Sequence, residues 1–318
     1  MPRTLIRFQH QDRPRWGLVF GPVIAPLDVD AVSTGELLDK HWDLLWSTPA
    51  SRATLPLAEV GLLAPVTTNQ QFLCQGINYR SHIQESGLRV EDFPFNTLFT
   101  KAPSCITAAD APVVRPAHVK LLDYEIELGL VLRRALPAAT KVAPEDLGQW
   151  LAGVTIVNDL SARDVQLPQG QFYKGKSYRG FGPVGPVLVL LSPEEWKRWP
   201  ELHMRLAVNG QVRQDAYCAE MIHQPAATLT ELAAMHEVNT GDLIATGTPA
   251  GCAARAPGKL VMWVFKHLLS DARKWQLFIE KGAANPAYLR PGDRISAAIR
   301  TDDGLIDLGE QTTRITVP

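Results

Sequence analysis

Short apolar runs, separated by turn residues, dominate the pattern of hydrophobic and polar positions along this chain. The runs that predict strands lie at 4–9, 15–21, 70–79, 123–134, 151–159, 185–191, 202–214, 241–248 and 291–301. Patterns typical of helices are fewer and cover residues 35–47, 228–238 and 263–281. Asn209-Gly210 stands between two apolar runs, which is the strongest short signal for a β-hairpin.

These elements predict an α+β protein dominated by β-structure. We expect a small N-terminal α/β unit at residues 1–65, followed at 66–318 by a larger domain whose mixed sheet curls or packs on itself. The alternating strand and helix pattern of a doubly wound nucleotide-binding fold is absent from the sequence.

Composition and charge narrow the class of protein. The chain has 318 residues and a formal net charge of -1, which gives no reason to expect a nucleic-acid partner or an anionic membrane surface. No stretch reaches the roughly 20 apolar residues of a membrane span, and charges interrupt the N-terminal segment, so we expect a cytoplasmic protein. The four cysteines are widely spaced, which argues against a zinc site and a disulfide scaffold.

The most informative segment is the alternation at residues 122–128. Asp123, Glu125 and Glu127 share one face of the predicted strand, and Asp159 follows the next apolar run at its end. Side chains two apart on a strand lie about 6–7 Å apart at the backbone, so their carboxylates can converge on one cation. The alternative is a solvent-exposed strand face. We favour a site with Glu125, Glu127 and Asp159 as ligands of Mg²⁺ or Mn²⁺, with Ca²⁺ as a third choice.

Cationic side chains follow the acidic positions. Arg163 and Lys176 lie just downstream of Asp159, where they can bind a substrate carboxylate or stabilise a developing enolate. Lysines in a solvated loop are the alternative interpretation for Lys174 and Lys176. The Gly-Lys-Ser sequence at 175–177 lacks the spacing of a phosphate-binding loop.

Two further segments carry candidate site residues. His82 and Glu85 are three residues apart, so one helical turn would place them on the same side, as a general base needs; an incidental surface pair is the alternative. The run 241–251 predicts a strand that ends in a turn containing Thr246 and Thr248. Its hydroxyl and N–H groups can hold a substrate oxygen, or the turn can serve only as a connection.

Taken in order, several segments resemble the fumarylacetoacetate hydrolase family. The resemblance covers roughly residues 72–251, with a similar tail at 291–299. The matching segments are GINYRSHIQE, PFNTLFTKAPS, LDYEIELGLVL, NDLSARDVQ, GKSYRGFGPVGP, VNGQVRQD and GDLIATGTPAG.

The resemblance implies a β-roll catalytic domain, usually a homodimer, that holds Mg²⁺ or Mn²⁺ at the three carboxylates. It also implies that His82 and Glu85 lie on a lid and activate water, with Lys176 assisting in catalysis. Further family positions that contact substrate fall on Arg163, Gln166, Thr246 and Thr248.

The resemblance also limits which reactions this chain is expected to catalyse. The leading prediction is hydrolysis of a C–C bond in a small acylpyruvate-like 1,3-dioxo carboxylate, as in the catabolism of aromatic compounds. The alternatives are an isomerase, tautomerase or decarboxylase of a 2-oxo diacid, and, from another class, a small-acid binding protein without catalysis. The fold does not choose among these reactions.

The sequence departs from the family pattern in two places. The segment 252–290 is longer than in compact family members, and we expect it to form an oligomer contact in preference to a cover over the site. Cys218 and His223 stand where small polar and aromatic residues are more usual, which leaves the substrate open.

Overall fold

The computed structural model describes residues 1–85, 89–92, 94–255 and 270–318. Within these residues the larger sheet has eleven strands. Their order across the sheet is β4 (Leu55–Pro56), β3 (Val23–Pro26), β2 (Arg13–Phe20), β1 (Arg3–His10), β15 (Leu188–Leu190), β12 (Leu151–Asn158), β11 (Ile126–Leu132), β18 (Leu243–Ala245), β6 (Phe72–Gly76) and β7 (Thr97–Lys101), with β5 (Gly61–Leu63) also paired to β1.

The described chain forms a second sheet of five strands and two short two-stranded pairs. The five-stranded order is β17 (Gln211–Tyr217), β16 (His203–Val208), β19 (Arg294–Arg300), β20 (Asp307–Thr316) and β9 (Val113–Val114). The short pairs are β10 (Leu122–Asp123) with β13 (Ser161–Ala162), and β14 (Gly182–Pro183) with β8 (Ile106–Thr107).

The two larger sheets pack against each other. Strand β11 contacts β16, while β12 contacts β19 and β20. Every residue of β11 and of β12 is buried, because one face meets the second sheet and the other is also covered. The larger sheet is mixed, since β18 and β6 are parallel and their other neighbours are antiparallel. The predicted β-dominated α+β class with a packed mixed sheet is therefore confirmed.

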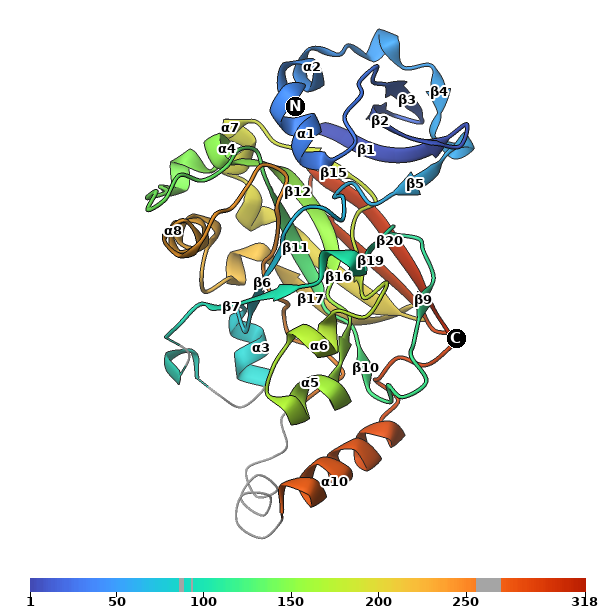
Figure 1. Ribbon diagram of the computed structural model, residues 1–318, viewed down its shortest axis with the longest axis vertical. Helices are drawn as coiled ribbons and strands as arrows, with labels where there is room; N and C mark the ends of the chain where they lie inside the picture. Colours follow the sequence, from blue (N-terminus) through green and yellow to red (C-terminus); the bar gives the residue numbers. More distant parts are fainter. Residues whose placement is uncertain (86–88, 93, 256–269) are drawn as a thin grey trace.

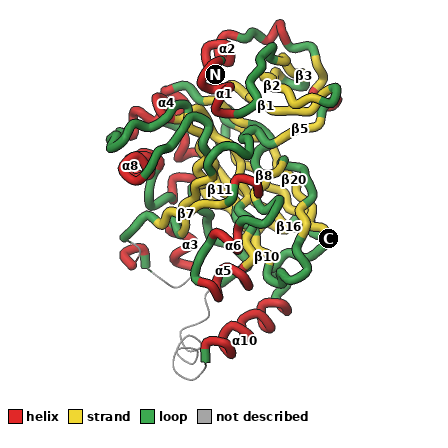
Figure 2. Tube along the Cα trace, viewed as in Figure 1, coloured by secondary structure: helices red, strands yellow, loops and turns green. Residues whose placement is uncertain are grey.

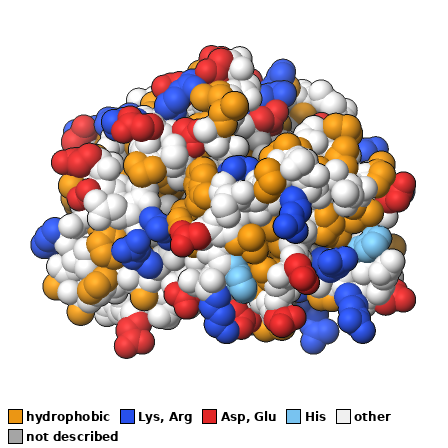
Figure 3. Space-filling view, turned by 90° about the horizontal axis from the view of Figure 1, so that it is seen from above, with side chains coloured by type: hydrophobic (Ala, Val, Ile, Leu, Met, Phe, Trp, Pro, Cys, Tyr) orange, Lys and Arg blue, Asp and Glu red, His pale blue; other side chains and the backbone are white. Residues whose placement is uncertain are grey.

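Helices lie around the sheets, which fill the centre of the molecule (Figures 1 and 2). They are α1 (Thr34–Lys40), α2 (Trp42–Ser47), α3 (Arg80–Glu85), α4 (Leu147–Trp150), α5 (Arg163–Gln169), α6 (Tyr173–Lys176), α7 (Pro193–Trp196), α8 (Pro225–Met235) and α10 (Asp271–Ala284). No helix among the described residues is both long and apolar enough to cross a membrane. The face in Figure 3 carries acidic and basic side chains interspersed, in keeping with the net charge of -1.

Several elements differ from the sequence prediction in their bounds. The amphipathic stretch 35–47 is two helices, which meet at His41. Helix α8 begins at Pro225, three residues before the predicted start, because proline is well suited to the first turn of a helix. Of the predicted helix 263–281, residues 256–269 lie outside the described part of the chain, and α10 extends away from the two sheets (Figure 1).

The hairpin predicted at Asn209-Gly210 joins β16 to β17. Both turn residues have positive φ angles, 51° and 79°. That conformation matches the twist of antiparallel strands, and asparagine followed by glycine adopts it at low cost. A register shift between Leu206 and Ala207 lies between this turn and the pair Leu206–Gln214, so the turn and the shift together set the position of Gln214.

Candidate metal centre and active site

Three carboxylates converge where β11 and β12 run side by side. Glu125, Glu127 and Asp159 are all buried, and one carboxylate oxygen from each lies within 4.8 Å of the others. The antiparallel register pairs Ile126 with Asn158, so the residue after β12 lies beside the start of β11. The interpretation as a solvent-exposed strand face is therefore wrong, and the three acids predicted to converge do lie together.

The acidic segment is not one continuous strand, as the alternation predicted. Pairing stops between β10 and β11, at Tyr124 and Glu125, and side chains take over the backbone hydrogen bonds there. Tyr124 N–H donates to the carboxylate of Asp123 (2.9 Å), and Glu125 N–H donates to Asn158 Oδ1 (3.1 Å). Buried N–H groups need such partners. The break turns Glu125 toward the end of β12.

Asp123 acts as a support for the neighbouring loop and helix. Its carboxylate accepts the N–H groups of Ala253 (2.7 Å) and Ala254 (3.0 Å), and it accepts Nε of Arg163 at 2.8 Å. The alternation placed Asp123 on the correct face, but no local pattern indicates these partners, which are 40 and 130 residues away in the chain.

Arg163, the first residue of α5, has all three of its nitrogens engaged. Besides Asp123, it donates through Nη2 to Glu125 Oε1 (2.5 Å) and through Nη1 to Gln166 Oε1 (2.9 Å). Arg163 and Gln166 were both predicted to contact substrate. In this arrangement they contact each other, and Arg163 offsets part of the negative charge of the acidic cluster.

Two buried lysines complete the charged centre. Lys176, at the end of α6, donates to Glu125 Oε2 and to Asp159 Oδ2. Lys101, the last residue of β7, donates to Asp159 Oδ1 at 2.6 Å and to the carbonyl of Phe181 at 2.7 Å. Lys176 was predicted from its position, whereas Lys101 was not. Lys101 lies in the segment PFNTLFTKAPS, which matches the family, but no site role was predicted for it.

Opposite charges and burial shift the pKa values of these acids in opposite directions. Burial opposes ionisation of Glu125, but Arg163 and Lys176 outweigh it and hold the pKa of that carboxyl well below its usual range. Burial, together with the neighbouring carboxylates of Asp159 and Glu125, raises the pKa of Glu127 well above its usual range. Glu127 accepts one backbone N–H, that of Gly247 (2.8 Å).

The arrangement fits a hard divalent cation. The donor set consists of buried carboxylate oxygens, which suits Mg²⁺, Mn²⁺ or Ca²⁺. Burial and the neighbouring carboxylates raise the pKa of Glu127, and a bound cation would stabilise its ionised form in place of a proton. Four carboxyl groups face three cationic side chains, so the protein leaves one negative charge for a cation to offset: Asp123, Glu125, Glu127 and Asp159 against Lys101, Arg163 and Lys176.

The predicted base lies on α3, beside this centre. Burial lowers the pKa of His82 from its usual 6.5, with Glu125 opposing the shift and Arg163 adding to it, so the imidazole is neutral at pH 7. Glu85, on the same helix, accepts Gly251 N–H at Oε2 (2.8 Å) and pairs with Arg255 through Oε1 (3.3 Å). These contacts fasten α3 to the segment after β18.

The threonines of the 241–251 turn contact the strand that carries the acids. Thr246 donates to the carbonyl of Leu128 and Thr248 to that of Ile126, both at 2.9 Å. Gln214 in turn donates to Thr248 (2.7 Å). The described contacts of both hydroxyls therefore hold the turn on β11, and their contact with substrate stays a prediction.

Comparisons with known proteins agree with the order of these segments. The family model described as fumarylacetoacetate (FAA) hydrolase C-terminal matches residues 71–316, and a second, described as Rv2993c-like, N-terminal, matches residues 4–65. Oxaloacetate tautomerase YisK of Bacillus subtilis is 33% identical over 246 residues, which are 76% of this chain and 71% of that protein.

Solved structures share the complete fold. A fumarylacetoacetate hydrolase from the psychrophile Exiguobacterium antarcticum superposes with a TM-score of 0.77 at 28% identity, covering 99% of this chain and 100% of the other. A 2-hydroxyhepta-2,4-diene-1,7-dioate isomerase from Mycobacterium marinum has a TM-score of 0.68 at 25% identity, covering 99% and 98%. The chain is a member of the fumarylacetoacetate hydrolase family.

Proposed function

We propose that the chain is a divalent-metal-dependent enzyme that interconverts the keto and enol forms of a small 2-oxo dicarboxylate. The observation that carries this proposal is the juxtaposition of three convergent buried carboxylates with a neutral imidazole, His82. Proton transfer next to a carbonyl needs one base and a means of stabilising negative charge on oxygen, and this site offers both.

The relatives support the same class of reaction. One is named an oxaloacetate tautomerase, and another an isomerase of a hydroxydienedioate. Both names describe movement of a proton and a double bond without cleavage of a carbon–carbon bond. Both name dicarboxylates, which suits a site with cations close to the acidic cluster.

The metal, held by Glu125, Glu127 and Asp159, would polarise the 2-oxo group of the substrate. His82 removes the proton from the enol hydroxyl and delivers it to the adjacent carbon, which restores the carbonyl. In the reverse direction His82 takes the carbon-bound proton. Arg163 and Lys176 hold positive charge beside the oxygen that becomes negative.

Hydrolysis of an acylpyruvate-like substrate is the second candidate. It is favoured by the likeness to the Exiguobacterium hydrolase and by the position of His82 and Glu85 on one helix. Hydrolysis needs a base oriented to activate water. We place tautomerisation first because the relative named an oxaloacetate tautomerase is 33% identical to this chain, against 28% for the Exiguobacterium hydrolase.

The test is to follow decay of the enol form of oxaloacetate by its ultraviolet absorbance, with Mg²⁺ or Mn²⁺ and with a chelator. We expect faster decay with metal and without release of pyruvate or CO₂. Release of pyruvate from acylpyruvates at a higher kcat/KM would favour hydrolysis, and CO₂ release would favour decarboxylation. Tight binding of oxalate with no turnover of any of these substrates would favour a binding protein.

We also propose, for assembly and organisation, a cytoplasmic homodimer with an N-terminal unit at residues 1–65 and a catalytic domain at 66–318. The strands of the first segment extend the larger sheet through the pairing of β1 with β15, so we expect both parts to unfold together. Light scattering on the purified chain tests the dimer. A second unfolding transition in a calorimetric scan would contradict joint unfolding.

A further inference from the structure

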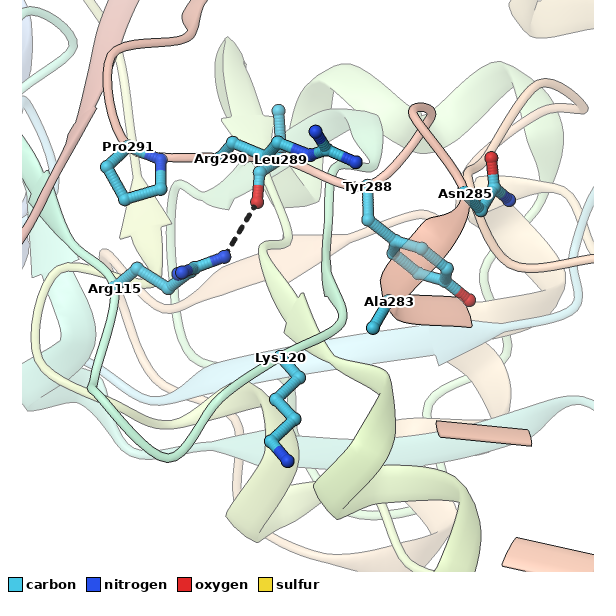
Figure 4. Close-up of a pocket in the computed structure, with 8 residues that line it drawn as sticks. All are labelled: Arg115, Lys120, Ala283, Asn285, Tyr288, Leu289, Arg290 and Pro291. Carbon is cyan, nitrogen blue, oxygen red and sulfur yellow. Dashed lines mark hydrogen bonds between the residues drawn. The ribbon is translucent and has the colours of Figure 1, made fainter. Parts of the chain in front are cut away.

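A pocket of about 300 Å³ lies apart from the carboxylates, where the segment after α10 meets the chain leading into β10. Figure 4 shows its lining, in which Arg115 and Lys120 come from one segment and Tyr288, Leu289, Arg290 and Pro291 from the other. The volume is at the lower end of the range for small-molecule sites.

The lining carries three cationic side chains and no carboxylate. In the part of the chain that the structure describes, none of Arg115, Lys120 and Arg290 forms an ion pair. Two acids lie nearby, and each accepts a backbone N–H: Asp164 that of Lys120 (2.7 Å) and Asp293 that of Arg290 (2.7 Å). Both carboxylates keep their charge, so three cations beside two acids leave an excess of one positive charge, with Lys120 and Arg290 exposed to solvent.

The end of α10 does not account for this excess. A helix C-terminus favours nearby cations, but it carries only about half an elementary charge. The excess of one full positive charge is larger than that. A bound anion would offset it, since like charges around one cavity repel each other.

The shape of the lining specifies the anion further. Two of the cations are arginines, and a guanidinium binds a carboxylate through two parallel hydrogen bonds. Tyr288 also lines the pocket, and its hydroxyl can donate a hydrogen bond. Leu289, Pro291 and the ring of Tyr288 offer an apolar surface for a short carbon chain.

We propose that this pocket is a second binding site, which takes a short dicarboxylate between Arg115 and Arg290. The lining of this pocket does not include Glu125, Glu127 or Asp159, so the proposal of a second site does not depend on the proposed reaction. Its wall is nevertheless continuous with the active site. Leu289 N–H donates to the carbonyl of Leu122 (2.8 Å), the residue before Asp123, which holds Arg163.

Calorimetric titration with succinate in the presence of a chelator tests the proposal on the full chain. The test variant is the double substitution Arg115→Gln and Arg290→Gln. The matched control is Arg13→Gln with Arg52→Gln, which removes two exposed arginines of the N-terminal segment. We expect one succinate per chain for the wild type and the control, and at least tenfold weaker binding for the test variant.

Absence of binding to the wild type, or equal affinity in both double variants, would overturn the proposal. A parallel titration with inorganic phosphate checks the class of anion, and tighter binding of phosphate than of succinate would refute the dicarboxylate assignment. A crystal grown with succinate gives an independent readout. Density between Arg115 and Arg290 supports the site, and density confined to the acidic cluster overturns it.

Discussion

Two charged clusters in this molecule use the same side-chain types in different surroundings. In the centre around Asp159, the charged side chains are buried and pair with one another. The second, which we call the surface cluster, lies at the ends of β16 and β17 and consists of Arg198, Glu201, His203, Asp215, Tyr217, Asp302 and Asp303. In the surface cluster Arg198 pairs with Glu201 (2.5 Å) and Asp303 (2.9 Å).

The difference lies in what each charge loses by folding. Exposed ion pairs exchange one well-solvated arrangement for another and contribute little. Buried ions give up water, and removing one partner leaves an uncompensated charge. An all-apolar core would be at least as stable as the buried centre, so its charges are better explained by binding and catalysis than by stability.

The largest effect should follow from Asp159→Asn, which keeps the shape of the side chain and removes its charge. This residue is both a predicted metal ligand and the partner of two lysines. We expect metal affinity to fall by more than the roughly 10–100-fold that loss of an outer hydrogen-bond partner costs. Calorimetry with Mg²⁺ and Mn²⁺ measures the change.

Asp215→Asn, in the surface cluster, is the matched control for Asp159→Asn. Asp215 contacts His203 at 2.5 Å but lies outside the acidic site. Metal affinity and activity should stay at the wild-type values. Equal losses in both variants would show that metal binding does not depend on the predicted ligands.

The next largest effect should come from His82→Gln, which removes the base. General-base catalysis contributes about 10²–10⁴-fold, so we expect kcat to fall within that range. Metal affinity should change little, because His82 is not among the three carboxylate ligands. Retention of full activity with correct folding would exclude His82 as the base.

The sequence predicted those parts of the site that depend on local pattern. Alternation placed Glu125 and Glu127 on one face, and an apolar run ending in Asp159 indicated a strand terminus. The break at Tyr124 could not be predicted, because it depends on the side chain of Asn158 and on the N–H groups of residues 253–254. Hydrogen bonds between distant segments leave no periodic signal.

Lys101 shows the same limitation more clearly. It reaches Asp159 because β7 pairs with β6 and β6 pairs with β18, an order that the apolar runs do not specify. For the fold, the β-dominated class followed from the number of apolar runs. The joining of the first strands to the larger sheet depends on the pairing of β1 with β15, which is equally non-local.

The substitution Lys101→Met tests whether a buried ion pair contributes more to the free energy of unfolding than an exposed one. Methionine fills a similar volume without charge. The change leaves Asp159 with Lys176, and the carbonyl of Phe181 with the N–H of Leu160 as its donor. We expect the free energy of unfolding to fall by about 3 kcal/mol, the lower end of the range for breaking a buried pair. Urea denaturation measures it, with Arg198→Met as the exposed counterpart.

The exposed variant should unfold at the wild-type urea concentration within error, since Arg198 lies at the surface. A loss in Arg198→Met as large as that in Lys101→Met would remove the distinction between the clusters. No loss in either would mean that Lys176 alone satisfies Asp159, and the second lysine would then need a role in catalysis.

The smallest effect concerns pH. Burial lowers the pKa of His82 below 6.5, so its neutral form persists at pH 7 and is lost only as the pH falls through the lower value. We expect kcat/KM to be level near pH 7 and to fall about tenfold per pH unit on the acid side of that pKa.

Glu127 also has to lose a proton as the pH rises, because its pKa is raised and only its ionised form binds a cation. The two groups separate when the profile is repeated at higher Mg²⁺: a limb due to Glu127 moves to lower pH as metal competes with the proton, whereas a limb due to His82 stays in place. An acid limb that begins above pH 6.5 and does not respond to Mg²⁺ would contradict a neutral, buried imidazole as the base.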